Sequence, residues 1–91
     1  MPEEIEKKFG IILKRLREDK NMSQEFLAND SDLDRTFISL LERGERQPSI
    51  STLFKLAASL GIKPSEIIKE LEDAYENSWN YLFPRIRKAY C

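Results

Sequence analysis

Apolar residues along this chain return every three or four positions, which is the period of an amphipathic helix rather than of a strand. The first stripe predicts a helix over about residues 3–19, with charged residues on its opposite face. The residues Lys20-Asn21-Met22 are expected to end it. The inward positions of this helix are Ile5, Phe9, Ile12, Leu13 and Leu16.

Two short helices are predicted next. Ser23 can cap the first of them, which should reach residue 29 or 30, before turn-forming residues at 30–32. Asp34 is placed to cap the second, and Gly44 stops it because glycine adopts the left-handed closing conformation without strain. The inward residues are Leu27 and Ala28 in the first helix, and Ile38 and Leu41 in the second, with Phe37 at its margin.

A fourth helix begins after Ser49 or Ser51 and is closed by Gly61. A fifth opens at residues 63–66, with Pro64 in the first turn, where the missing amide costs nothing. The predicted core side chains are Leu53, Leu56, Ala57 and Leu60 in the fourth helix, and Ile67, Ile68 and Leu71 in the fifth.

The composition changes after Leu71, because five of the nine aromatic residues fall in residues 72–91. Pro84 predicts a bend over about residues 77–83, followed by a short terminal helix. The expected fold class is therefore all-α. We expect a compact five-helix domain over residues 1–71 and a helical, aromatic-rich C-terminal extension over residues 72–91.

The composition excludes most enzyme chemistry. The 91 residues suit one small domain, and they include no histidine and a single cysteine, Cys91. A disulfide framework, a Cys/His zinc site and histidine-dependent catalysis are therefore excluded. We expect no enzyme activity, metal, cofactor or small-molecule effector. Apolar runs of at most three residues predict no membrane span and no secretory signal, so a cytoplasmic protein is expected.

Two short helices joined by a short turn, around residues 23–43, have the length and pattern of a helix-turn-helix. The strings Met22-Ser23-Gln24-Glu25, Leu33-Asp34-Arg35-Thr36-Phe37-Ile38-Ser39, Leu41-Glu42-Arg43-Gly44 and Pro48-Ser49-Ile50 resemble the Cro and phage-repressor-like (XRE) family. The stretch 33–39 is similar to the controller proteins of restriction-modification systems. The resemblance implies a repressor-like fold and a transcriptional regulator that binds double-stranded DNA, and such controllers typically regulate their own promoter.

The predicted recognition helix spans about residues 34–43, and its N-terminal side chains would reach base edges in the major groove first. Arg35 can present two donors to guanine, while Thr36 and Ser39 can hydrogen-bond to bases. Leu40 either packs on a thymine methyl group or is a tolerated surface residue. Gln24, at the start of the preceding helix, is a candidate for both base and phosphate contacts.

Further candidates for phosphate contacts are Ser23, which can also act as a cap, and Arg43, Arg46 and Gln47 in the loop after the recognition helix. A solvated loop is the alternative for the last three. The family resemblance implies an ion pair between Arg17 and Glu42 that orients the recognition helix, with Arg17 also able to reach a phosphate.

One recognition helix carries too little information to select a site in a genome, so a homodimer on a pseudopalindromic operator is expected. Relatives in this family often dimerise through their last helices, and aromatic side chains are enriched in interface cores. The alternatives are that the extension caps its own domain, or that it binds another protein, as in an antitoxin. The predicted interface residues are Ile67, Leu71, Tyr75, Trp79, Leu82, Phe83 and Ile86.

The formal net charge of -1 gives DNA binding no support in bulk. We expect this net charge to be an average over an acidic face and a basic face of the protein. Acidic groups at residues 3–6, 30–34 and 66–76 should face solvent, whereas Arg35, Arg43 and Arg46 lie on or beside the recognition helix. Binding to random sequences should therefore be weak.

Overall fold

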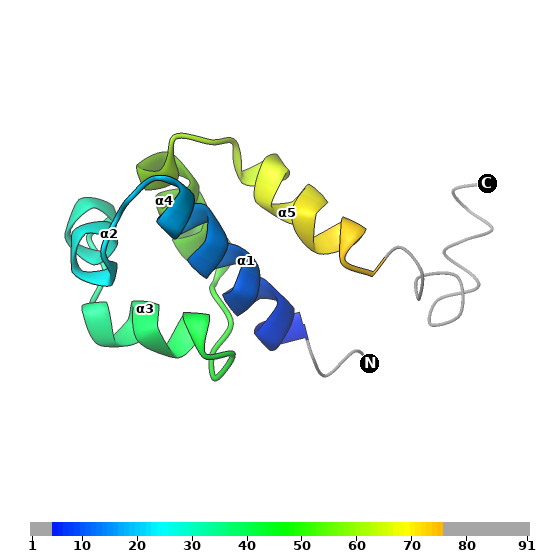
Figure 1. The fold of residues 1–91 in the computed structure, drawn as a ribbon, viewed down its shortest axis with the longest axis horizontal. Helices are drawn as coiled ribbons and strands as arrows, with labels where there is room; N and C mark the ends of the chain where they lie inside the picture. Colours follow the sequence, from blue (N-terminus) through cyan, green and yellow to red (C-terminus); the bar gives the residue numbers. More distant parts are fainter. Residues whose placement is uncertain (1–4, 76–91) are drawn as a thin grey trace.

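The computed structural model describes residues 5–75, which form five helices and no strand (Figure 1). The fold is therefore all-helical, as predicted. The predicted bend and terminal helix of the extension, together with Trp79, Leu82, Phe83 and Ile86, lie outside the described residues. The helices are α1 (Ile5–Asp19), α2 (Gln24–Ser31), α3 (Arg35–Glu42), α4 (Ile50–Leu60) and α5 (Pro64–Asp73).

Side-chain caps begin three of the helices. Ser23 accepts a hydrogen bond from the backbone N–H of Phe26 at 3.0 Å, and Asp34 accepts one from that of Thr36 at 3.0 Å. Of the two candidates for α4, Ser49 is the cap, and it accepts from the Thr52 N–H at 3.1 Å. Each cap satisfies an amide that the helix itself leaves without a partner, so these starts follow from local sequence.

The end of α2 lies later than predicted. Ser31 was expected in a turn, but it is buried in the last turn of the helix, and its Oγ donates to the carbonyl oxygen of Leu27 at 2.6 Å. This back-bond allows a turn-forming residue to remain helical. The chain then reverses at Asp32, which has the left-handed φ of 59°.

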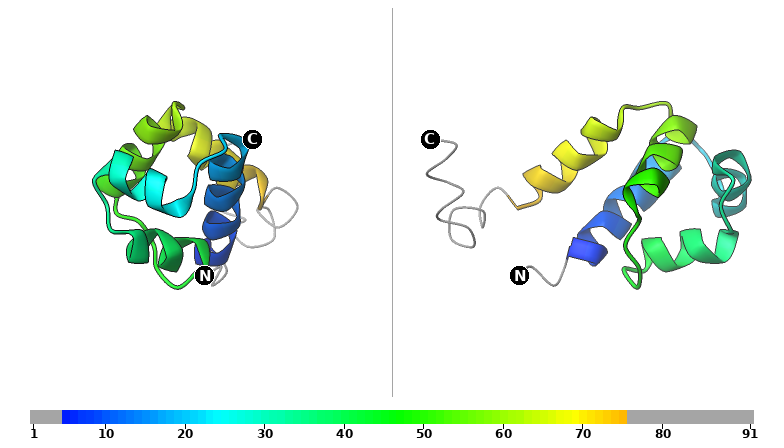
Figure 2. Two further views of the ribbon diagram at one scale, coloured as in Figure 1. Left: turned by 60° about the vertical axis from the view of Figure 1, so that its left-hand side comes forward. Right: turned by 180° about the vertical axis from the view of Figure 1, so that it is seen from behind.

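The core runs between the helices, and its fully buried side chains come from all five of them. Helices α2 and α3 lie at one end of the molecule and α5 at the other, with α1 and α4 between them (Figures 1 and 2). The fully buried large side chains are Leu13, Leu27, Ile38, Leu41, Leu56, Leu60 and Ile67.

The assignment of Ile68 to the core is wrong, because 48% of this residue is exposed. Successive residues of an α-helix point about 100° apart, so the direction in which α5 packs turns Ile67 into the core and leaves Ile68 at its edge. Ile67 takes the inward position and is 1% exposed, whereas Leu71, one turn later, is half-buried and packs against the core.

Candidate DNA-binding surface

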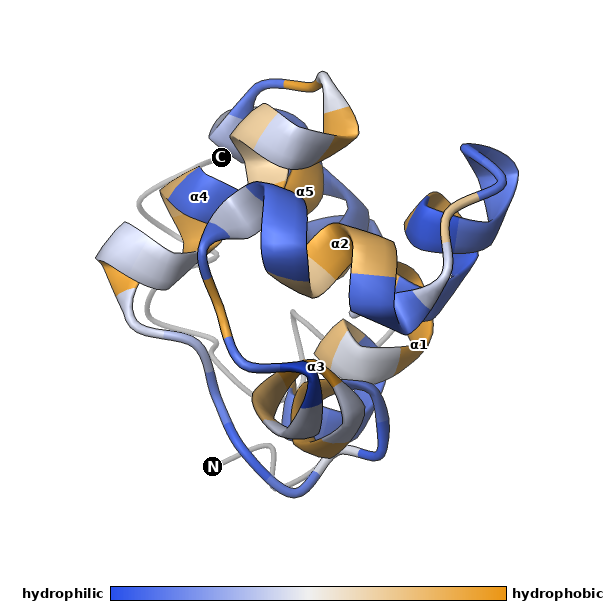
Figure 3. Ribbon diagram, turned by 90° about the vertical axis from the view of Figure 1, so that its left-hand side faces the viewer, coloured by the Kyte–Doolittle hydropathy of each residue, from blue (hydrophilic) through white to orange (hydrophobic). Residues whose placement is uncertain are grey.

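A three-residue turn joins α2 to α3. The Leu33 N–H donates to the carbonyl oxygen of Ala28 at 2.8 Å, which closes α2, and the side chain of Asp34 opens α3. Leu33 is half-buried and packs against the core. The turn before α3 and the loop after it are mostly hydrophilic (Figure 3). Polar connections therefore flank a helix whose inner side is anchored in the core.

The outer side of α3 begins with Arg35 and Thr36, which are both exposed. The two other predicted base-contacting residues on this helix, Ser39 and Leu40, are half-buried. Ile38 and Leu41 hold the opposite side of the helix in the core. The first turn of α3 is thus the part that a nucleic-acid groove could meet most directly.

A buried ion pair joins α1 to the end of α3, as the family resemblance implied. The Arg17 Nε lies 2.6 Å from the Glu42 Oε2, and the Arg17 Nη2 lies 3.0 Å from the Oε1, so the pair is bidentate. Only 9% of the Arg17 side chain and 3% of the Glu42 side chain is exposed. The hydrogen bond to Glu42 raises the pKa of Arg17, so the guanidinium stays charged.

Two further groups complete this network, and sequence reasoning missed both contacts. The remaining terminal nitrogen of Arg17, Nη1, donates to the carbonyl oxygen of Met22 at 2.7 Å. The Gln24 amide nitrogen donates to the Glu42 Oε1 at 3.0 Å. Arg17 of α1 and Gln24 at the start of α2 are therefore both tied to the carboxylate at the end of α3. Because the Arg17 guanidinium is enclosed in these contacts, the geometry favours its structural role over its predicted phosphate contact.

The loop after α3 carries the other basic candidates. Arg43 and Arg46 are exposed, and the Arg43 Nε lies 3.5 Å from the Glu45 Oε2 in an exposed pair. Gln47 donates through its amide nitrogen to the Glu6 Oε2 at 2.9 Å, and this hydrogen bond lowers the pKa of Glu6. The loop is thereby linked to the first turn of α1.

The expected separation of acidic and basic faces is incomplete. Glu6 lies against Gln47, Asp34 adjoins Arg35, and Glu45 pairs with Arg43. All three carboxylates therefore lie beside candidate DNA-contacting side chains rather than on a separate acidic face. Their positions follow from a cap and from contacts between side chains, which a count of charges along the chain does not reveal.

Within residues 5–75, no group of three or more His, Cys, Asp or Glu side chains could hold a metal ion. No helix in the same part of the chain is long and apolar enough to cross a membrane.

A short helix with an exposed N-terminal turn, packed across a second helix through a tight turn, defines the helix-turn-helix class of DNA-binding proteins. A family model described as helix-turn-helix, HTH_3, matches residues 13–67. The chain therefore belongs to this helix-turn-helix family, of XRE type, and is a DNA-binding transcriptional regulator.

Two relatives with sequences similar to much of the chain are control proteins. The chain is 44% identical over 70 residues to control protein C.MunI of a Mycoplasma species, covering 76% of this chain and 95% of that protein. It is 43% identical over 61 residues to control protein C.BamHI of Bacillus amyloliquefaciens, covering 66% of this chain and 75% of that protein. The crystal structure of the restriction-modification controller protein C.AhdI from Aeromonas hydrophila matches with a TM-score of 0.67 and 45% identity, covering 68% of this chain and 94% of that chain.

Proposed function

We propose that this protein is a sequence-specific regulator that binds double-stranded DNA as a homodimer on a pseudopalindromic operator, with α3 in the major groove. The exposed first turn of α3 carries the proposal. Arg35 and Thr36 lie in this turn, and the other end of the helix is held by the carboxylate of Glu42. A helix held in this way presents its N-terminal side chains to base edges in a defined direction.

Direct readout rests mainly on Arg35, whose guanidinium can donate in parallel to the O6 and N7 of a guanine. Thr36 and Ser39 add hydrogen bonds, and Leu40 contributes an apolar contact to a thymine methyl group. Gln24 is available to DNA through the carbonyl of its amide, because its nitrogen already donates to Glu42.

The backbone contacts set the register of the protein on DNA. We assign them to Ser23 and Gln24 at the start of α2, where the amides of the helix terminus also favour a phosphate oxygen. Arg43, Arg46 and Gln47 supply the contacts that follow α3. Arg43 and Gln47 would exchange their carboxylate partners for phosphates on binding.

The homodimer is supported by apolar residues that the domain leaves uncovered beside its last two helices. Ile50 and Phe54, one turn apart on α4, are 76% and 58% exposed, and Ile68 on α5 is 48% exposed. Ile67 and Tyr75 are buried in their own chain, so of the predicted interface residues in the described part only Leu71 adjoins this face. Two copies would place their recognition helices about 34 Å apart, in successive major grooves.

The similarity to control proteins supports a controller role in a restriction-modification system, with the protein regulating its own promoter. No observation on the described residues favours the antitoxin-like alternative.

Selection of duplexes from a random DNA pool tests the proposal and identifies the operator in the same experiment. We expect the selected sites to contain two related half-sites about 10 base pairs apart, centre to centre. Arg35→Ala should weaken binding to the selected site by about 1 to 3 kcal/mol per subunit and leave binding to random DNA nearly unchanged. Equal loss on both DNAs, or no loss, would refute readout by Arg35.

Arg15→Ala is the matched control, because Arg15 is an exposed arginine on α1 that pairs with Glu70 of α5 at 2.6 Å. Arg15→Ala should change neither the affinity for the selected site nor the affinity for random DNA. Arg43→Ala should weaken binding to all sequences alike and reduce the salt dependence, as loss of a phosphate contact does.

A further inference from the structure

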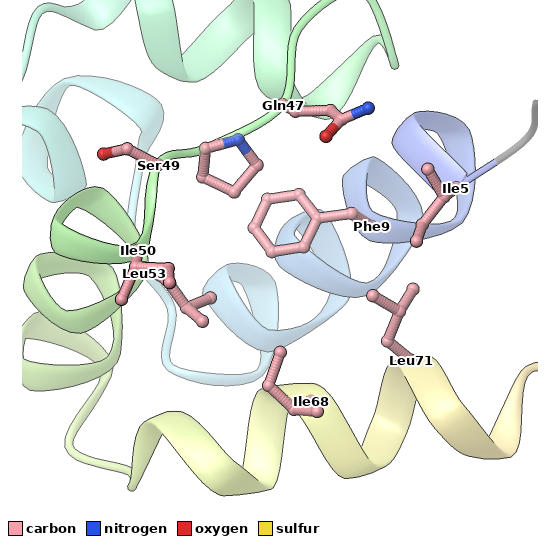
Figure 4. A pocket seen from close by; sticks show the side chains of 9 residues that line it. Ile5, Phe9, Gln47, Ser49, Ile50, Leu53, Ile68 and Leu71 are labelled. Carbon is pink, nitrogen blue, oxygen red and sulfur yellow. The ribbon is translucent and has the colours of Figure 1, made fainter.

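An apolar hollow of about 180 Å³ lies between α1, α4 and α5 (Figure 4). The ring of Phe9 extends from α1 toward Leu53 of α4, and Ile68 and Leu71 rise from α5 on the other side. Ile5 and Ile50 complete its apolar wall. Gln47 and Ser49, from the segment that precedes α4, also line the hollow. Gln47 is the one proposed DNA-contacting residue in this lining, so the other proposed contacts do not use the hollow.

Exposed apolar side chains also stand at the rim of the hollow, beside the polar Gln47 and Ser49. Ile50 and Ile68 stand on either side of it, 76% and 48% exposed, and Phe54 continues the apolar surface one turn along α4. Exposed apolar surface that is continuous with a hollow is typical of an interaction site. A cavity of roughly 150 Å³ accommodates a benzene ring, so this hollow has room for an aromatic side chain.

We propose that the hollow receives the aromatic C-terminal segment, residues 76–91, of a second copy of the chain. The segment supplies the matching side chains, because it contains Trp79, Tyr81 and Phe83 within five residues. It follows directly on Tyr75, which is buried beneath the ammonium group of Lys8, 5.3 Å from the ring centroid.

Charge complementarity also supports this occupant. The exposed face of α5 carries Glu66, Glu72 and Asp73, and Lys69 on the same helix already pairs with Asp73 at 3.4 Å. The C-terminal segment is basic beyond its aromatic residues. Its basic residues are Arg85, Arg87 and Lys88, against the single carboxylate side chain of Glu76. A segment seated in the hollow beside α5 would therefore bring opposite charges together.

The assignment to a second copy rests on the proposed homodimer. Each chain carries one hollow and one aromatic segment, and a two-fold axis makes their exchange reciprocal, so both hollows are filled at once. The exchange also places the partner against Ile50 and Phe54, which extend beyond the hollow itself.

Trp79 is the only tryptophan of the chain, so its fluorescence reports directly on the segment. In the full-length dimer, we expect blue-shifted Trp79 emission that shifts to longer wavelength on dilution to monomers. Ile68→Asp should expose Trp79 at every concentration and weaken dimerisation at least about tenfold, because a charge would enter an apolar contact. Ile11→Asp, on an exposed position of α1 outside the hollow, should behave as the wild type. Ile50→Asp repeats the test if Ile68→Asp does not fold.

Mixing two variants distinguishes exchange from folding back. A chain with Ile68→Asp retains Trp79 but has a damaged hollow, whereas a chain with Trp79→Phe is without tryptophan and has an intact hollow. Adding an excess of the second chain should shift the emission of the first back to shorter wavelength.

Absence of recovery, or buried Trp79 in the monomer, would overturn the proposal. A dimer in sedimentation whose Trp79 is exposed would overturn only this inference, while a wild type that never dimerises would overturn the proposed homodimer as well.

Discussion

Gly10 lies where α1 packs closely against the end of the recognition helix. A Cβ atom at this position would lie 2.5 Å from the carbonyl oxygen of Leu41 and 2.6 Å from that of Glu42. Cβ atoms essentially never approach another heavy atom closer than 3.0 Å, so the end of α3 would have to retreat by at least the 0.5 Å difference. The obstacle is backbone, which cannot turn aside as a flexible side chain could.

Two opposing terms set the stability of Gly10→Ala. Helix propensity favours alanine over glycine by about 1 kcal/mol. Overpacking of a close contact costs about 1 to 3 kcal/mol. We therefore expect a change between about 0 and 2 kcal/mol, in the destabilising direction. The displaced residue Glu42 also holds Arg17 and Gln24, so the recognition helix should move even where stability is nearly kept.

Urea unfolding of Gly10→Ala should be measured together with its affinity for a selected DNA site and for random DNA. We expect the specific affinity to fall at least about tenfold, which corresponds to about 1.4 kcal/mol, with little change on random DNA. Ile11→Ala, at the exposed neighbouring position, is the control. The reasoning would be refuted if Gly10→Ala were about 1 kcal/mol more stable than the wild type and bound DNA as the wild type does. That result would show that the close packing of α1 against α3 does not position the recognition helix.

Three further predictions concern individual contacts. Glu42→Gln leaves the buried guanidinium of Arg17 without a counter-charge, and should lower the free energy of unfolding in urea by about 3 kcal/mol; a loss below about 1 kcal/mol would contradict this role. The hydrogen bond from Gln47 lowers the pKa of Glu6 in the folded protein. The stabilisation from this contact is therefore present above the unfolded-state pKa of Glu6 and is lost as the pH falls through the folded-state pKa. Carboxyl NMR should show a titration midpoint for Glu6 below that of ordinary glutamates, and Gln47→Leu should raise this midpoint to the ordinary range. Ser49→Ala removes the cap of α4 and should cost about 1 kcal/mol in thermal unfolding, with unchanged DNA affinity.

Local signals predicted the helices well because each signal acts within a few residues. Ser23, Asp34 and Ser49 cap the helices that follow them, and Gly61 closes α4 with a φ of 72°. The end of α2 was predicted less well, because the composition of residues 30–32 does not show that Ser31 is buried and back-bonded to its own helix.

The inward faces followed from periodicity except where two apolar neighbours competed. Ile67 and Ile68 are equally apolar, and the direction in which α5 packs decides which of them is buried. The same packing decides that Ile50 and Phe54 remain exposed on α4. No pattern within a single helix contains that information.

For the candidate site, the sequence by itself determined the helix-turn-helix, its caps, and the residues at the first turn of the recognition helix. Tertiary structure alone decided how that helix is held: Gln24 shares the Glu42 carboxylate with Arg17, Gln47 contacts Glu6, and Gly10 admits the end of α3. The physical reason is range. Capping and periodicity act between neighbours in the chain, whereas these contacts join residues 18 to 41 positions apart that meet only after the helices have packed.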